Sequence, residues 1–408
     1  MKHNSDIVLL FLTRIIRMFA YGFVSVALVL YLSEIGLTDA AIGLLLSLTL
    51  MGDVGVSLWV TTKADRMGRK RMLIFGAVLM AGAGAVFVFT NNIVLLTLAA
   101  IIGIISPSGN EIGPFLSIEQ ASLSQLLPDK NRTSAFGWYN LAGSFATAAG
   151  ALDGGWLAEM LQQQSGWSRL DAFRMILSGY AASGLALMVL FAWLSSGIET
   201  VREKTVRTNL GLHRSRNIVF RLSALFALDA FAGGFILQSM MAYWFHVRFG
   251  ADTGVLGSIF FGANLLAGVS ALLASRMASR FGLINTMVFS HIPSNVLLCM
   301  VPLMPTLASA IIVLMLRFSI SQMDVPTRQS YTMAVVALDE RTAASGITNI
   351  ARSVGASLSP ALTGLFLAHP ALVSAPFFLA GGLKIIYDLF LFRMFQHVRP
   401  PEEKGIKR

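Results

Sequence analysis

Charged residues are scarce in this sequence. Asp, Glu, Lys and Arg make up 13% of its 408 residues, about half of the roughly 25% that is typical of a globular chain. Hydrophobic residues make up 55% of the sequence, and no stretch is polar enough to form a large separate domain. The composition therefore excludes most soluble enzymes and predicts an integral membrane protein embedded in a lipid bilayer.

Cysteine is nearly absent as well, since Cys299 is the single cysteine in the sequence. One cysteine excludes a disulfide framework and a cysteine-based metal site. The sequence also has no glycine-rich phosphate loop followed by Lys and Ser or Thr, and no His-Glu-x-x-His pattern. We therefore expect no enzyme activity, no ATP-driven pump, no bound metal and no cofactor.

Long hydrophobic runs, by contrast, are numerous. A helix needs about 20 mostly apolar residues to span the ~30 Å hydrocarbon core of a bilayer, and twelve stretches meet this requirement. They lack the alternating pattern of a membrane β-barrel, so helices must satisfy their backbone hydrogen bonds in lipid. The predicted fold class is an all-α polytopic membrane bundle with spans at residues 7–32, 40–61, 71–89, 93–127, 133–160, 170–196, 217–247, 254–275, 283–303, 306–336, 342–368 and 371–396.

Positive charge is in excess, with 31 Lys and Arg against 21 Asp and Glu. In a soluble protein a net charge of +10 would suggest a nucleic-acid partner. Here most of the cations fall in alternate connections between the spans, and the opposite connections hold only Arg169 and Arg248. The positive-inside rule then places both termini in the cytosol. We expect the protein to lie in the plasma membrane and to have no nucleic-acid partner. A basic surface at 197–216 that recruits a partner or anionic lipid is the alternative.

Internal symmetry is visible in the sequence. Residues 120–155 align without a gap to 329–364, with nine identities, and Phe19–Phe23 resembles Phe231–Phe235. The two offsets, 209 and 212 residues, are about half the chain. We therefore predict two six-span halves, 1–196 and 217–408, joined by a polar cytosolic linker at 197–216. Parallel repeats with a site between them near the midplane are a secondary-transporter architecture.

A basic motif follows the second span and carries a family resemblance. The stretch from Thr61 to Arg71 reads TTKADRMGRKR, and it resembles the Gly-x-x-x-Asp-Arg-x-Gly-Arg-Lys signature of the major facilitator superfamily. Thr61 replaces the leading glycine. The resemblance implies a transporter with twelve helices and a cytosolic gate formed by Asp65, Arg66, Gly68 and Arg69, in which Gly68 allows a tight turn and the charges pair across the closed gate. Alternatively, the cations only fix the topology.

A second motif lies in the fifth span. Residues 150–155 read GALDGG and resemble the family's antiporter signature, Gly-Pro-x-x-Gly-Gly, with Ala151 in the proline position. The aligned segment of the second half retains a proline, Pro360. Small residues let helices approach and slide, so Gly150, Gly154, Gly155 and Pro360 are predicted to form a helix-packing hinge, with plain packing as the alternative. The resemblance favours export by antiport, although no arginine occurs early in the fourth span.

Ionisable residues deep in the spans are the first candidates for the functional site, because a charge at mid-bilayer costs about 2.5 kcal/mol or more. Arg17 and Asp229 occupy equivalent positions in spans 1 and 7. In the resembled family these spans line the central cavity, so we predict that Arg17 and Asp229 face each other as a site pair. The alternative is that each is satisfied within its own half by a local partner such as Asp53.

Span 4 contains two prolines and two glycines around an acid, in the sequence SPSGNEIGP from Ser106 to Pro114. These residues predict a broken helix in which Glu111 binds a proton or a cation. Asp324 lies near a proline in span 10 in a similar way. The ungapped alignment also opposes Glu119 to Arg328, which predicts an ion pair between the halves that opens with the cytosolic gate. A static pair within one half is the alternative.

Other buried charges are predicted to be structural. Lys384 and Asp388 lie four residues apart in span 12, a spacing that favours mutual neutralisation on one face of a helix. Arg352 in span 11 and Asp53 in span 2 are expected to pair with neighbours in the same way.

Three functions remain open at this point. The first is a monomeric, alternating-access secondary transporter that exports a small organic solute in exchange for protons. The second is uptake or exchange of an anionic metabolite, with Arg17, Arg317 or Arg328 as the anchor for a carboxylate or phosphate. The third is a transport-inactive membrane scaffold or sensor, although a scaffold has little reason to keep buried charges and a broken helix.

Overall fold

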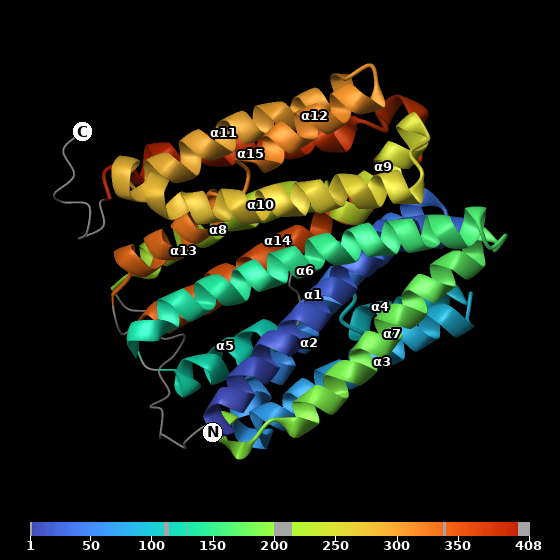
Figure 1. Cartoon of the computed structure of the whole chain (residues 1–408). Helices are drawn as coiled ribbons and strands as arrows, with labels where there is room; N and C mark the ends of the chain where they lie inside the picture. Colours follow the sequence, from blue (N-terminus) through green and yellow to red (C-terminus); the bar gives the residue numbers. More distant parts are fainter. Residues whose placement is uncertain (1, 110–113, 128, 200–213, 338–339, 399–408) are drawn as a thin grey trace. The chain divides into compact units, whose positions relative to one another are not determined.

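The structure, a computed structural model, describes residues 2–109, 114–127, 129–199, 214–337 and 340–398. These residues form helices and connecting turns without a strand (Figure 1). The helices are α1 (Lys2–Glu34), α2 (Asp39–Met67), α3 (Arg69–Phe89), α4 (Ile93–Ile102), α5 (Phe115–Leu126), α6 (Asp129–Gln163), α7 (Arg169–Trp193), η1 (Ser196–Ile198), α8 (Arg216–Gly234), α9 (Gln238–Phe249), α10 (Thr253–Phe281), α11 (Leu283–Met300), η2 (Val301–Leu303), α12 (Leu307–Phe318), α13 (Asp324–Val335), α14 (Arg341–Leu367), η4 (Pro370–Leu372) and α15 (Ala375–Phe395).

These helices account for the twelve predicted spans. Within the described residues, nine segments are long and apolar enough to cross a membrane, and α4 and α12 are shorter apolar helices. The two shorter helices continue, after a break, into α5 and α13, which completes spans 4 and 10. The fifth span is α6, a helix of 35 residues.

Span 4 is broken, as the prolines and glycines predict. Helix α4 ends at Ile102 and α5 begins at Phe115. The backbone turns through positive φ angles at Ile104 (55°) and Gly109 (67°). The hydroxyl of Tyr180 donates a hydrogen bond of 2.7 Å to the carbonyl oxygen of Ile104, so a neighbouring helix satisfies a carbonyl group that the break has freed.

Two further spans are broken in the second half. Span 10 is interrupted between α12 and α13, and span 7 between α8 and α9. The break in span 7 was not predicted, although Gly233 and Gly234 precede it. There the hydroxyl of Thr363 donates to the carbonyl oxygen of Phe235 at 3.1 Å. The backbone N–H of Ser239 donates to the carbonyl oxygen of Pro107 at 3.1 Å, which joins the breaks of spans 4 and 7.

The chain divides into two compact units. Unit 1 comprises Met1–Glu203 and Leu237–Asn264, and unit 2 comprises Lys204–Ile236 and Leu265–Arg408. Unit 1 thus includes α9 and the first part of α10, which follow the predicted linker in the sequence. The predicted division into 1–196, 197–216 and 217–408 stays a prediction.

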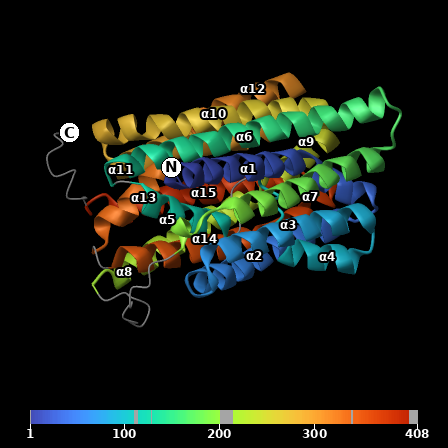
Figure 2. The same ribbon diagram turned by 60° about the horizontal axis from the view of Figure 1, so that its bottom comes forward.

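Glycines bring the backbones of neighbouring helices into contact in both units. Helices α1 and α6 lie side by side in unit 1, as do α3 and α7 (Figures 1 and 2). A Cβ atom on Gly22 would lie 2.1 Å from the carbonyl oxygen of Thr147. In unit 2, a Cβ atom on Gly234 would lie 2.5 Å from the carbonyl oxygen of Ala356. The same contact therefore occurs twice, at the two offsets that the sequence alignment gives.

The predicted hinge glycines lie in these contacts. A Cβ atom would lie 2.0 Å from the carbonyl oxygen of Phe19 at Gly150 and 2.3 Å from that of Phe23 at Gly154. Gly155 faces α10, where a Cβ would lie 2.3 Å from the carbonyl oxygen of Thr253. Pro360 lies inside α14. The three glycines share close packing, whereas Pro360 is buried within α14. A hinge motion stays a prediction.

We expect Gly150→Ala to destabilise the protein by about 1–3 kcal/mol, the usual cost of overpacking a core. The added methyl group would overlap the backbone of α1 and force α1 and α6 apart. Gly137→Ala is the matched control, because Gly137 lies on the same helix and a Cβ atom there would have no neighbouring atom within 4 Å. Thermal unfolding of the detergent-purified variants measures the difference, and equal melting temperatures would contradict this packing.

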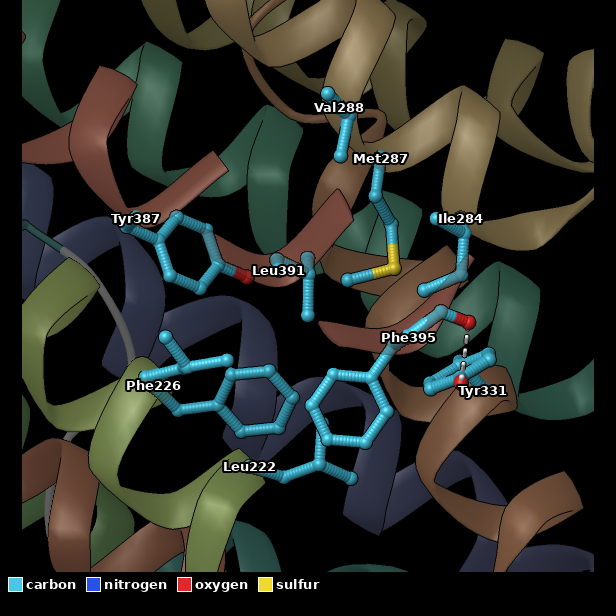
Figure 3. Close-up of a cluster of buried hydrophobic side chains, with 10 residues drawn as sticks. Leu222, Phe226, Ile284, Met287, Val288, Tyr331, Tyr387, Leu391 and Phe395 are labelled. Atoms are coloured by element: carbon cyan, nitrogen blue, oxygen red, sulfur yellow. Dashed lines mark hydrogen bonds between the residues drawn. The ribbon is translucent and has the colours of Figure 1, made fainter. Parts of the chain in front are cut away.

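A cluster of apolar side chains fills the core of unit 2 (Figure 3). It joins Leu222 and Phe226 of α8 to side chains of α11, α13 and α15. The ring of Phe226 lies edge-on to that of Tyr387, with centroids 6.5 Å apart. The guanidinium carbon of Arg328 lies 5.6 Å from the centroid of the Phe226 ring, so this apolar cluster adjoins charged residues.

Candidate functional site

A fully buried ion pair lies in unit 1. Arg17 of α1 donates to both oxygens of Glu119 of α5, through Nη1 to Oε1 at 2.9 Å and Nη2 to Oε2 at 2.6 Å. Both side chains are 0% exposed. The carboxylate also accepts hydrogen bonds from the hydroxyls of Thr13 and Tyr139. Because the pair is bidentate and further hydrogen-bonded, the two charges compensate each other although neither side chain is exposed to solvent.

A second arginine, Arg14, lies one turn before this pair on α1. Its Nε donates to the carbonyl oxygen of Tyr139 at 2.9 Å, and its guanidinium carbon lies 4.3 Å from the centroid of the Tyr139 ring. A Cβ atom on Gly143 would lie 2.7 Å from Nε. The absence of a side chain at Gly143 therefore makes room for Arg14 between α1 and α6.

Unit 2 contains a larger cluster centred on Asp229 of α8. Oδ1 of Asp229 accepts from Nζ of Lys384 at 2.6 Å, and Oδ2 accepts from Nη1 of Arg352 at 3.0 Å and Nη1 of Arg328 at 3.3 Å. Arg328 also donates to Asp324 at 2.8 Å. The Asp229 side chain is 4% exposed, whereas that of Arg352 is 29% exposed. Three cations thus share two carboxylates, and Arg352 is the most accessible of them.

The ion pairs of the two units are the same pair with the charges reversed. Arg17 and Asp229 are equivalent at an offset of 212, and Glu119 and Arg328 are equivalent at an offset of 209. The cation is on the first span of unit 1, and the anion is on the corresponding span of unit 2. Each unit therefore supplies the counter-charge for its own buried ion.

This arrangement corrects the predicted partners and agrees with the alternative, in which each charge is paired within its own half. Arg17 and Asp229 were expected to pair with each other, and Glu119 with Arg328. In the structure Arg17 pairs with Glu119, and Asp229 pairs with Arg328. The physical reason is that an opposite charge lies within hydrogen-bonding distance inside each unit, which satisfies each buried ion locally. The part that Arg17, Asp229, Asp324 and Arg328 play in transport stays a prediction.

The predicted local pair between Lys384 and Asp388 is also wrong. Lys384 binds Asp229, and Asp388 contacts His291 of α11, with 2.9 Å between Nδ1 and Oδ1. The side-chain amide of Asn295 donates to the other oxygen of Asp388 at 3.3 Å. Spacing along one helix predicted the pair, but helices on either side of α15 offer partners to each residue. His291 was not among the predicted site residues, and Lys384 and Arg352 were predicted to be structural.

The basic motif forms a junction within unit 1. Gly68 has a φ angle of 101° and separates α2 from α3, which is the predicted tight turn. The carboxylate of Glu199 accepts from the backbone N–H groups of Arg69 at 2.7 Å and Lys70 at 3.2 Å, where an anion stabilises the start of α3. The Arg69 side chain donates to Gln125 at 3.0 Å and to the carbonyl oxygen of Ile198 at 3.2 Å. Arg69 therefore ties α3 to α5 and to the segment after α7.

The contacts of three predicted site residues are not described. The side chains of Asp65 and Arg66 lie outside the described residues, as does Glu111 in the break of span 4. Their predicted roles stay predictions.

Arg317, at the end of α12, is buried and 8% exposed. Its Nε and Nη1 atoms have no hydrogen-bond partner among the described residues. Its guanidinium carbon lies 4.7 Å from the centroid of the Phe318 ring. A buried guanidinium group with unused donors can bind an anion.

Helical spans in two repeats, with broken helices and buried charges, define a membrane transporter. The sequence model of the Major Facilitator Superfamily matches residues 10–360 and 225–408. The uncharacterized membrane protein YJR124C of Saccharomyces cerevisiae is 30% identical over 99% of this chain and 97% of its own length. The chain belongs to the Major Facilitator Superfamily.

Two further comparisons agree with this assignment. The quinolone resistance protein NorA of Staphylococcus aureus is 24% identical over 157 residues, which cover 38% of this chain and 39% of NorA. A crystal structure of a D-xylose–proton symporter matches all of this chain and all of its own chain with a TM-score of 0.75 at 14% identity, which supports the fold alone. The predicted fold class and family are confirmed, and the protein is an integral, multi-pass membrane transporter of a solute.

Proposed function

We propose that this protein is an alternating-access secondary transporter that exports a small organic solute from the cell in exchange for protons. It acts as a monomer in the plasma membrane, with both termini in the cytosol. The observation that carries the proposal is the buried cluster around Asp229, in which two carboxylates and three cations lie beside broken membrane helices. Such charges are costly in lipid, and they are retained where ions or solutes pass.

In this transport cycle the buried charges bind the solute or the proton. Arg17, Asp229, Asp324 and Arg328 form the substrate or proton sites, together with Glu111, which lies outside the described residues. When a span moves, a buried ion must keep its partner or gain a new one, because an unpaired charge costs several kcal/mol. Arg352 is 29% exposed while it contacts Asp229, so a solute reaching it can compete for that contact. Solute binding can thereby change the ion pairs that hold the spans of unit 2.

The cytosolic gate in this proposal includes the basic motif. Gly68 and Arg69 hold the start of α3 against Glu199, and Asp65 and Arg66 belong to the same gate. Glu119 contributes through its pair with Arg17. Gly150, Gly154, Gly155 and Pro360 are the packing positions at which helices slide during the cycle. A small organic solute is further supported by the likeness to NorA, whose name describes a quinolone resistance protein.

A second candidate function is exchange or uptake of an anionic metabolite. Arg17 and Arg328, two of the predicted anchors, are already paired with carboxylates. Arg317 keeps two nitrogen atoms without a partner among the described residues, and this observation favours it as the anchor for a carboxylate or phosphate group. The third candidate, a transport-inactive scaffold or sensor, has no specific observation in its favour.

Transport by purified protein in liposomes with an imposed pH gradient tests these functions. For antiport, we expect a transported solute to trigger proton movement, and Glu111→Gln to reduce that flux by at least about tenfold, because the variant removes the proposed proton-binding carboxylate. Gradient-independent exchange of an anion, lost in Arg317→Gln, would instead support the second function. If a broad solute screen yields no transport at all, the scaffold or sensor function is left.

A further inference from the structure

Buried carboxylates in the described residues differ in the kind of partner that neutralises them. Asp6 and Glu340 accept from backbone N–H groups near helix ends. Glu119, Asp229 and Asp324 are each bonded to arginine. The sixth buried acid of this part of the chain, Asp388, is bonded to His291 and Asn295. Arginine stays charged at every physiological pH, whereas histidine changes its charge between about pH 5 and 8.

The geometry of the His291 and Asp388 pair suits the binding of one proton. The His291 side chain is 6% exposed and the Asp388 side chain 1%. When Asp388 is ionised, Nδ1 of His291 carries the hydrogen that points to Oδ1, and the two heavy atoms are 2.9 Å apart. The lone pair of Nε2 is then the position for a second proton. Asn295 donates to the other carboxylate oxygen and so fixes the orientation of Asp388.

Helix α15 connects this pair to the cluster around Asp229. Lys384 lies one helical turn before Asp388, and its Nζ binds Asp229. Besides Arg216, Arg221, Arg341 and Arg393, the charged groups on α8, α12, α13, α14 and α15 are three carboxylates and four cations. They are Asp229 on α8, Arg317 on α12, Asp324 and Arg328 on α13, Arg352 on α14, and Lys384 and Asp388 on α15, with the phenols of Tyr331 and Tyr387 as the other titratable groups.

The formal charges give the consequence of protonation. Apart from Arg317, which makes no ion pair among the described residues, the three carboxylates balance Arg328, Arg352 and Lys384 when His291 is neutral. A proton on His291 gives this bonded network a net charge of +1. The network lies in a low-dielectric interior, where one added charge acts strongly on its neighbours.

An aromatic ring and apolar residues of α11 lie near this pair, and solvent hardly reaches it. The ring of His291 lies edge-on to that of Tyr387, with centroids 6.1 Å apart. Met287 and Val288 precede His291 by about one turn of α11, and they belong to the apolar cluster of unit 2 (Figure 3). A proton on His291 would therefore lie in a largely buried site within one unit.

We propose that His291 and Asp388 form a binding site for the coupling proton in addition to Glu111, and that Lys384 couples its occupancy to the ion pairs of Asp229. The proposal rests on the proposed proton-coupled function, which it makes more specific. The proton binds to Nε2 of His291, the imidazolium is stabilised by Asp388, and no covalent bond other than N–H forms or breaks. The added positive charge acts on Lys384 and loosens its hold on Asp229, which Arg352 and Arg328 then retain.

The first test is independent of transport. The full chain has six histidines, and ¹⁵N-histidine NMR of the purified protein follows their protonation between about pH 5 and 9. We expect one buried histidine signal to titrate, to disappear in His291→Gln and to shift in Asp388→Asn. An absence of any titration of His291 over this range would overturn the proposal.

The second test uses transport in the liposomes described above. We expect His291→Gln to reduce solute-driven proton flux by at least about tenfold, while solute exchange at equal pH on both sides continues. His246→Gln is the matched control, since His246 lies at the end of α9, partly exposed, against the carbonyl oxygen of Ala251, and it should keep wild-type proton flux. Melting temperatures identify any variant that does not fold.

The outcomes separate this proposal from the proposed function. Wild-type proton flux in folded His291→Gln would overturn the proton site and leave proton-coupled transport intact. An absence of solute-driven proton flux in the wild type would overturn proton-coupled export, and with it the coupling role of His291, even where the NMR titration shows that His291 binds a proton.

Discussion

Asp229→Asn is expected to abolish transport and to lower the stability of the protein by about 3–5 kcal/mol, the usual cost of removing one partner from a buried ion pair. The substitution keeps the shape of the side chain and removes its charge. Arg328 would keep its contact with Asp324, whereas Lys384 and Arg352 would lose the carboxylate that they contact. Solute flux in liposomes and thermal unfolding in detergent measure the two effects.

A compensating variant distinguishes lost charge balance from lost shape. In wild type, the cluster of Asp229, Asp324, Arg328, Arg352 and Lys384 has one cation more than it has carboxylates. Asp229→Asn combined with Lys384→Met restores that excess of one and should recover more than half of the lost stability while transport remains absent. If Asp229→Asn alone melts at the wild-type temperature, Asp229 does not hold three cations in the way described.

Glu119→Gln is expected to have a similar effect on unit 1, again about 3–5 kcal/mol, because it leaves Arg17 charged and fully buried without a counter-ion. The side-chain amide would also meet the hydroxyls of Thr13 and Tyr139, which donate to the carboxylate in wild type. Urea or thermal unfolding of the purified variant measures the loss.

The paired replacement tests whether the charges themselves are needed for stability. Replacing a buried ion pair with apolar residues of similar size is often neutral or stabilising, so Arg17→Met combined with Glu119→Leu should melt close to wild type. Transport by that variant decides the role of the pair: loss of flux in a stable protein assigns it to the cycle, and full flux assigns it to structure alone. A double variant as unstable as Glu119→Gln would contradict the proposed cause of the loss.

The fold could be predicted largely from the sequence, because hydropathy directly determines which segments enter lipid. The same is true of the break in span 4, where Pro107 and Pro114 cannot continue a helix. The break in span 7 follows Gly233 and Gly234, and glycine pairs occur elsewhere within unbroken helices, such as Gly154 and Gly155 in α6. Glycine alone therefore did not distinguish a break from close packing.

The side-chain partners in the candidate site were predicted less well than the fold, because sequence symmetry identifies equivalent positions only. The alignment correctly matched Arg17 with Asp229 and Glu119 with Arg328 as equivalent positions, but equivalence does not say which residues touch. Lys384 and Asp388 show the same limit for helix spacing, since a residue four positions away competes with partners on other helices. Glu199 was not predicted, because in the sequence an acid in a connecting segment cannot be distinguished from a solvated charge. Its contact with the start of α3 is visible only in the structure.

The charge reversal between the two units has a consequence for how the protein is made. During synthesis each span enters the membrane before later spans exist. Glu119 is synthesised 102 residues after Arg17. Arg328 and Lys384 are synthesised 99 and 155 residues after Asp229. The first half can thus complete its ion pair before the second half leaves the ribosome, whereas Asp229 acquires its full set of counter-ions only when the last helix is inserted.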